Sequence, residues 1–119
     1  MTPRPPRSLQ LLHVGHKAPI PLGARVGPLI CSSGIAGKDP ADGSLPPDGA
    51  TQVAHAFTNL QALLAAGGAG LEHVVKLAIT LASDDLREPV NTQWLACFPD
   101  PADRPARHIV VQPLGHGMQ

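Results

Sequence analysis

An arginine at the start of a short apolar strand is the residue of this chain best suited to bind a small anion. Arg107 follows Pro105, and the proline ring favours an extended backbone on this approach. The β-branched, alternating run at residues 108–112 predicts a strand. A guanidinium at a strand entrance is a planar, permanently charged fork that can grip a carboxylate in two places. Arg107 is therefore the candidate carboxylate anchor, and a solvated arginine or a structural ion pair is the alternative.

The cysteines and histidines do not follow a metal-binding pattern. Cys31 and Cys97 fall in a predicted strand and a predicted helix, and neither has a histidine at metal-ligand spacing. In a reducing compartment we expect both cysteines to be small buried hydrophobic residues. His13 and His16 are close in sequence, but a strand would place them on opposite faces. The sequence therefore predicts no metal site and no bound cofactor.

The composition indicates a small single domain that does not bind nucleic acid. A chain of 119 residues is one domain by size and can bury a real core. Nine basic and nine acidic residues give a net charge of zero, which argues against a nucleic-acid surface. Phe57, Trp94 and Phe98 are too few aromatic residues for a base-stacking platform. No segment could span a bilayer, and proline stands where a signal peptide would be apolar, so we expect a cytoplasmic protein.

The first half of the chain predicts strands and a surface loop. Residues 1–17 form a proline-rich leader and a first strand, the strand at residues 9–14. A second strand is expected at residues 25–32, with a bend or turn at Gly27 and Pro28. The stretch 34–49 is polar and rich in proline and glycine, so it belongs in a surface loop.

The second half predicts two helices and two strands. Apolar residues between positions 53 and 64 recur at helical spacing, with Asp48 or Thr51 as cap and Gly67 as stop. Four polar residues lie outside this apolar stripe: Gln52, His55, Asn59 and Gln61. A second helix starts near Leu86, and its apolar stripe includes Trp94. The candidate caps of that helix are Ser83, Asp84 and Asp85.

Residues 74–82, between the helices, alternate with a period of two and predict a strand with two different faces. One face is bulky and fits beneath the helices: Val75, Leu77, Ile79 and Leu81. The other carries small side chains around Lys76, which favours contact with another sheet. The order of elements predicts an α/β fold, with α+β layering and two helices on one face of a mixed β-sheet.

Several short segments resemble, in order and spacing, the Rid family of reactive imine/enamine deaminases, also called YjgF-type or L-PSP proteins. The resemblance runs from about residue 18 to residue 119, and no internal repeat or second domain competes with it. Its pieces are Ser32-Ser33-Gly34, the loop 39–44, Gln52, Asn59-Leu60, Ala66-Gly67, Val74-Val75-Lys76, Val90-Asn91 and Pro105-Ala106-Arg107.

This resemblance implies a chorismate-mutase-like subunit, a single Rid-type domain at residues 18–119, that assembles as a homotrimer with ligand clefts between subunits. Arg107 would anchor the substrate carboxylate, and Ser33 and Gly34 would line the cleft. The typical reaction hydrolyses 2-aminoacrylate and related imino acids, released by pyridoxal-phosphate enzymes, to a 2-keto acid and ammonia. An enamine becomes an imine and water attacks the imine carbon, while the protein orients the acid and stabilises charge on nitrogen.

The chain departs from the family pattern around the cleft. Ile20 stands where the archetypes place a tyrosine, and Ile35 stands where a glutamine often follows the Ser-Gly pair. Relatives continue beyond the position of Gln119 into a strand that bears an acidic residue associated with positioning the water. We therefore expect this C-terminal strand to be missing from the domain. The carboxylate anchor is present, whereas the water-handling acid is not seen.

Two more residues are candidates at the cleft, and three functional classes stay open. Asn91, on the inner helix, is expected to bond loop backbone, and His116, in a Gly-His-Gly turn, is a candidate base. The first functional class is an imine/enamine deaminase, and the second is a non-catalytic carboxylate-binding or regulatory relative that retains Arg107. The third, a ribonuclease or translation inhibitor, fits poorly with a net charge of zero.

Overall fold

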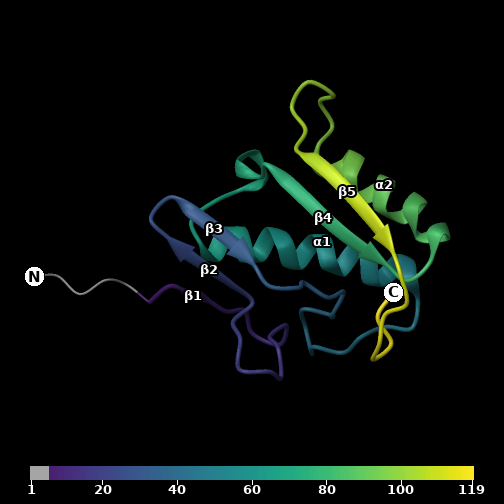
Figure 1. Ribbon diagram of the computed structural model, residues 1–119, viewed down its shortest axis with the longest axis horizontal. Helices are drawn as coiled ribbons and strands as arrows, with labels where there is room; N and C mark the ends of the chain where they lie inside the picture. The colour runs from purple at the N-terminus through teal and green to yellow at the C-terminus, as the bar shows by residue number, and fades with distance from the viewer. Residues whose placement is uncertain (1–5) are drawn as a thin grey trace, which may run out of the picture.

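The strands lie on one side of two helices, as the computed structural model shows for residues 6–119 (Figure 1). The first five residues of the predicted leader lie outside the described residues. The elements in chain order are β1 (Ser8–Leu9), β2 (Gly23–Val26), β3 (Leu29–Ser32), α1 (Gly49–Ala66), the 3-10 helix η1 (Leu71–His73), β4 (Lys76–Leu81), the 3-10 helix η2 (Asp84–Leu86), α2 (Arg87–Cys97) and β5 (Ala106–Val111). The predicted α/β fold class is confirmed.

Hydrogen bonds divide the strands between two sheets. β1, β2 and β3 form an antiparallel sheet in that order, and β4 and β5 form a parallel pair joined by the α2 crossover. The predicted second strand is in fact the β2–β3 hairpin, which turns at Gly27 with a φ of 57° that glycine adopts without strain. The first strand, predicted at residues 9–14, is β1 at Ser8–Leu9. The chain does not stay extended through residue 14, since His13 takes a φ of 71°.

The long helix α1 forms the centre of the core. Asp48 caps its start by accepting a hydrogen bond from the Thr51 amide at 3.0 Å, and Gly67 follows its end, as predicted. The main buried cluster joins this helix to β4 and to the start of α2: Val53, Phe57, Leu81, Leu86 and Val90. Sheet residues pack against that cluster from the other side: Leu77, Ile79 and Ile109. The bulky face of the β4 strand therefore lies beneath the helices, as expected.

Burial differs from the prediction at five residues. Gln52 and Asn59 are buried although they lie outside the apolar stripe of α1, because the 33–48 loop and the C-terminal residues cover that side of the helix. Val75 is 83% exposed, since β4 begins only at Lys76 and the helices do not reach the preceding turn. Cys31 is exposed on β3, so its predicted burial is wrong, and Cys97 is half-buried.

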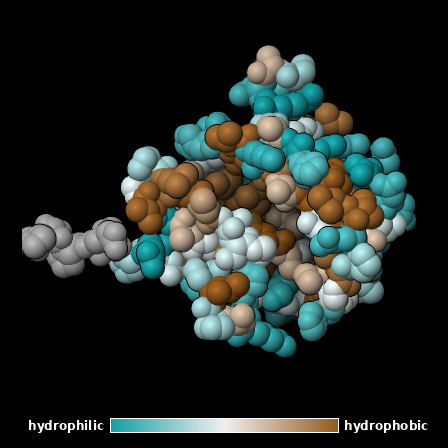
Figure 2. All heavy atoms as spheres, viewed as in Figure 1, coloured by the Kyte–Doolittle hydropathy of each residue, from teal (hydrophilic) through white to brown (hydrophobic). Residues whose placement is uncertain are grey.

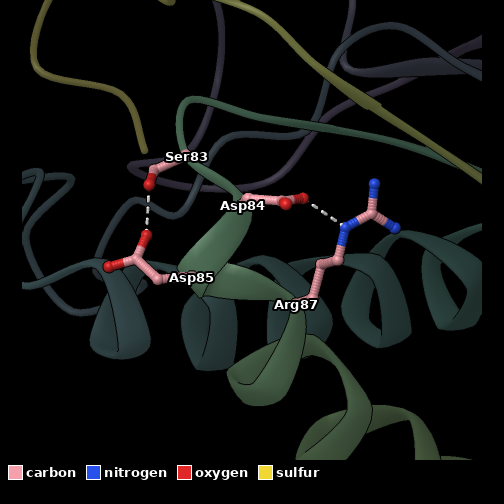
Figure 3. Close-up of polar contacts among 4 residues, drawn as sticks. All are labelled: Ser83, Asp84, Asp85 and Arg87. Atoms are coloured by element: carbon pink, nitrogen blue, oxygen red, sulfur yellow. Dashed lines mark hydrogen bonds and ion pairs between the residues drawn. The ribbon is translucent and has the colours of Figure 1, made fainter.

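The polar residues before α2 bind one another rather than capping that helix. The Ser83 hydroxyl donates to the Asp85 carboxylate, and Arg87 Nε donates to Asp84 Oδ1 at 2.6 Å (Figure 3). Leu86 is the residue at the N-cap of α2, and within the described chain no side chain bonds the helix there. The predicted role of these acids as caps of α2 is therefore wrong. Pro89 lies in the first turn, where its missing N–H is tolerated, as predicted.

Candidate active site

Arg107 is the second residue of β5, opposite Leu77 in the parallel register. It alternates with His108, so the arginine side chain points to the helix side of the sheet and His108 to the open side. The Arg107 Cζ atom lies 5.0 Å from the centroid of the Trp94 ring on α2. This distance is within the range of a cation–π contact. The parallel β4–β5 pair and its α2 crossover thus bring the candidate anchor onto an aromatic ring.

Trp94 is the site residue that the sequence analysis missed, because it reads equally well as a core residue of the α2 stripe. The ring is 9% exposed and contacts Phe98, with the two ring centroids 4.8 Å apart and the planes tilted by 58°. The spacing of four places both aromatic residues on one side of α2. The sequence could have indicated this contact, because a helix that connects two parallel strands packs against those strands. An aromatic residue on that helix was therefore a candidate neighbour of Arg107.

The charge of Arg107 is not neutralised within the described chain. Between residues 6 and 119 the ion pairs join Arg87 to Asp84 and His73 to Glu72. Arg25 donates a hydrogen bond to the Gly67 carbonyl at 2.8 Å, and Arg104 donates one to the Phe98 carbonyl at 2.8 Å. The donors of Arg107 therefore stay available to an anionic ligand, unlike those of Arg25, Arg87 and Arg104.

The other predicted cleft residues gather at the end of β3, on the antiparallel sheet. The Ser33 amide donates to the Leu22 carbonyl at 2.8 Å, which brings the segment of Ile20 beside Ser33. Ile20 is 45% exposed, and Ile35 is half-buried. Gly34 is exposed, and a Cβ added there would meet nothing within 4 Å. Its φ is not positive, so a strained turn does not explain this glycine.

Asn91 and His116 lie in different places. Asn91 is half-buried on α2, three residues before Trp94 and therefore on the same side of the helix. His116 is exposed at a φ of 58°, in a turn that Gln52 ties to α1 by donating Nε2 to the Gly117 carbonyl at 2.9 Å. This turn follows the end of β5, whereas Arg107 lies at its start, a separation of roughly 13 Å along the strand. Within a single chain, His116 therefore does not lie beside Arg107.

A recess beside the start of β5 does not suit an anion. Its volume is about 400 Å³, and its lining includes three carboxylates: Glu72, Asp100 and Asp103. Arg104, which also lines it, is held by the Phe98 carbonyl. Within residues 6–119 no three His, Cys, Asp or Glu side chains gather in a way that could hold a metal ion. None of the helices described has the length and apolar character needed to cross a membrane.

The comparison with known families decides the identity of the chain. A family model described as endoribonuclease L-PSP matches residues 20–119. This chain belongs to the Rid/L-PSP family. Among solved structures, RidA from an Antarctic Psychrobacter species is 26% identical, with a TM-score of 0.83 over 94% of this chain and 91% of that one. A candidate endoribonuclease from Thermotoga maritima is 29% identical, with a TM-score of 0.83 over 95% of this chain and 90% of that one.

One more solved structure is similar to this chain in fold alone. TdcF of Escherichia coli, solved with bound serine, is 20% identical, with a TM-score of 0.83 over 95% of this chain and 91% of that one. No curated protein sequence matches this Rid/L-PSP chain significantly. Family and fold are therefore shown, whereas the names of the relatives differ in the activity that they suggest.

Proposed function

We propose that this Rid/L-PSP protein hydrolyses small reactive 2-imino acids, and the enamines from which they form, to 2-keto acids and ammonia. The observation that carries the proposal is the Arg107 guanidinium, which lies over the Trp94 ring and forms no ion pair within the described residues. A permanently charged fork of this kind suits the carboxylate that every such substrate carries. Serine, the ligand named for the similarly folded TdcF, is also a small molecule with a carboxylate.

The proposed reaction needs little beyond orientation and charge stabilisation. Arg107 holds the carboxylate, and the enamine tautomerises to the imine. Water adds to the imine carbon, the tetrahedral adduct loses ammonia, and the keto acid leaves. Ser33 and Gly34 line the opposite wall, where the open space around Gly34 leaves room for the substrate. Orientation of the acid and stabilisation of charge on nitrogen are the contributions assigned to the protein.

The two halves of the proposed site belong to different subunits of a homotrimer. Arg107 lies on the parallel sheet and Ser33 follows the antiparallel one, and both are half-buried in a single chain. The sheet face away from the helices is exposed along both strands at Ala78, Thr80, His108 and Val110. Figure 2 shows apolar side chains gathered around a hollow on the face where Figure 1 places the strands. Packing three such faces around an axis would bury them and bring Arg107 to a neighbour's loops.

Binding to Arg107 is the first test. Arg107→Ala should weaken calorimetric binding of pyruvate or 2-oxobutanoate by about 10- to 150-fold, since a charge-assisted bidentate contact contributes roughly 1.5–3 kcal/mol. Arg107→Lys should also bind poorly, because a point charge cannot reproduce the fork. The control is Arg87→Ala, which removes an arginine engaged by Asp84 at the far end of β4. Unchanged affinity in Arg107→Ala would remove this residue from the site.

Turnover is tested separately from binding. Coupled to a serine or threonine dehydratase, the protein should accelerate conversion of the transient aminoacrylate or aminocrotonate to keto acid and ammonia. One observation favours a second candidate, a carboxylate-binding protein without turnover: no carboxylate within residues 6–119 forms an ion pair with Arg107. Ligand binding with decay at the spontaneous rate across several imines would establish that second function.

The endoribonuclease description of the family motivates a third measurement. A net charge of zero offers little of the phosphate attraction on which RNA binding depends. We therefore expect no salt-sensitive binding of a single-stranded RNA and no cleavage of it. Tight binding that falls steeply between low and high salt would favour the ribonuclease over the deaminase.

A further inference from the structure

Trp94 is the surface against which the candidate anchor rests. Arg107 Cζ lies 5.0 Å from the centroid of its ring, so the guanidinium is attracted to the ring without using any N–H donor on an acceptor. A carboxylate in the protein would hold the arginine too, but it would compete with the ligand for the same donors. An aromatic ring holds the cation in place and leaves its hydrogen-bonding fork free.

Three other arginines of the described chain, Arg25, Arg87 and Arg104, are held in a different way. Arg25 donates to the carbonyls of Gly27 and Gly67, at 3.0 Å and 2.8 Å. Arg104 donates to the Phe98 carbonyl, and Arg87 to the Asp84 carboxylate. Each of these side chains donates hydrogen bonds to acceptors within the protein. Arg107 instead lies against an aromatic ring, which leaves its N–H donors available to a ligand.

The ring itself is fixed. Trp94 is 9% exposed and packs against Phe98, which is 4% exposed, one turn further along α2. Trp94 lies on the helix that connects β4 to β5 and Phe98 directly follows that helix, so the ring and the arginine are positioned by one parallel crossover unit. A rigid ring limits the rotamers of a long side chain before the ligand arrives, and such pre-organisation raises affinity.

We propose that Trp94 is a positioning residue that holds the Arg107 guanidinium with its donors directed to the ligand carboxylate. The inference rests on the proposed function of Arg107 and adds a specific determinant of affinity. Trp94 is the single tryptophan of the chain, which also lacks tyrosine, so the tryptophan emission comes from this ring. Loss of the cation in Arg107→Ala and arrival of a carboxylate at Arg107 should both change that emission.

The experiment compares three variants by calorimetric titration with pyruvate or 2-oxobutanoate, at temperatures well below their unfolding transitions. Trp94→Leu removes the ring and should weaken binding by roughly 5- to 30-fold, the size of a partly desolvated cation–π contact. Trp94→Phe keeps a smaller ring and should recover part of this loss. Leu95→Ala, at a 54% exposed position of the same helix, is the control, and it should bind within about twofold of the unmodified protein.

The emission of Trp94 supplies a readout that a purely structural role would not move. The spectrum should shift on addition of the keto acid to the unmodified protein and should not shift in Arg107→Ala. Wild-type affinity in folded Trp94→Leu, or identical ligand-free spectra for Arg107→Ala and the unmodified protein, would overturn the inference. Failure of the unmodified protein to bind any small 2-keto acid would instead overturn the proposed function, and the positioning role with it.

Discussion

At the scale of single residues, two amides on α1 organise the loops around the site. Asn59 is 1% exposed and donates Nδ2 to the carbonyls of Ala36 and Lys38, at 3.1 Å and 2.9 Å. Gln52 donates to the Pro46 and Gly117 carbonyls and accepts from the Gln119 amide. These bonds satisfy loop carbonyls that burial removes from water. The loop that follows Ser33 is therefore held against the helix by side chains rather than by a sheet.

Removing the Asn59 amide should destabilise the fold. Asn59→Leu leaves the Ala36 and Lys38 carbonyls without their donor, so the free energy of unfolding should fall by about 1–3 kcal/mol. Urea unfolding followed by Trp94 emission measures this change. Gln61→Leu, on an exposed position of the same helix, is the control and should alter stability by about 0.5 kcal/mol or less. Equal midpoints for the two variants would contradict the role assigned to Asn59.

The two cysteines should differ in reactivity. Burial raises the pKa of the Cys97 thiol, so less of it is thiolate at a given pH, and the thiolate is the species that alkylating reagents attack. Iodoacetamide at pH 8 should therefore modify the exposed Cys31 first. Mass spectrometry of the unmodified protein and of Cys31→Ser follows the two sites. Rapid single labelling of Cys31→Ser would show that Cys97 is not shielded.

At the scale of elements, the site depends on how α1 and the β4–α2–β5 unit begin and end. The parallel crossover sets Arg107 above Trp94, and α1 supports both sheets from behind (Figure 1). The start of α1 is held by Asp48, whose carboxylate accepts from the Thr51 hydroxyl at 2.6 Å and from the Thr51 amide at 3.0 Å. These bonds favour the charged carboxylate, so the pKa of Asp48 is lowered.

Asp48→Ala should lower the Tm at neutral pH, because the first turn of α1 loses its cap. The folded-state pKa of Asp48 lies below its unfolded value, so its stabilisation is complete above the unfolded pKa. It is lost as the pH falls through the folded pKa, and the Tm difference between variant and wild type should shrink there. Calorimetric scans across this acidic range measure it, with Asp103→Ala as an exposed control. A Tm difference that grows on acidification would contradict the assignment.

At the scale of the whole molecule, the homotrimer that we propose would complete the site with a second copy of the chain. Lys76, Ala78 and Thr80 are exposed on β4, and Ala106, His108 and Val110 lie beside them on β5. This face carries the small side chains of Ala78, Thr80 and Ala106 between Lys76 and His108, and the helices cover the other side. A cyclic trimer would bury this face of each of its three subunits and leave none of them exposed for further association.

Light scattering should therefore give a mass of about three times 12.4 kDa at micromolar concentration. Ala78→Glu should disrupt the trimer, because three like charges would meet in a poorly hydrated space, and carboxylate binding should be lost with it. Ala62→Glu makes the same change on an exposed position of α1 and should leave the mass unaltered. A monomeric mass for the unmodified protein would refute both the trimer and the shared cleft.

The sequence by itself determined the features that depend on local pattern. The apolar spacing of α1, its Asp48 cap, the period-two run of β4 and the proline before Arg107 are all readable along the chain, and the structure agrees with them. Only the tertiary structure decided what covers each element from outside. Gln52 and Asn59 look solvent-facing until distant loops fold over them, and Trp94 looks like core until β5 brings a guanidinium onto its ring. Periodicity records which face of an element is apolar, whereas contacts between distant segments depend on the path of the chain and leave no period to read.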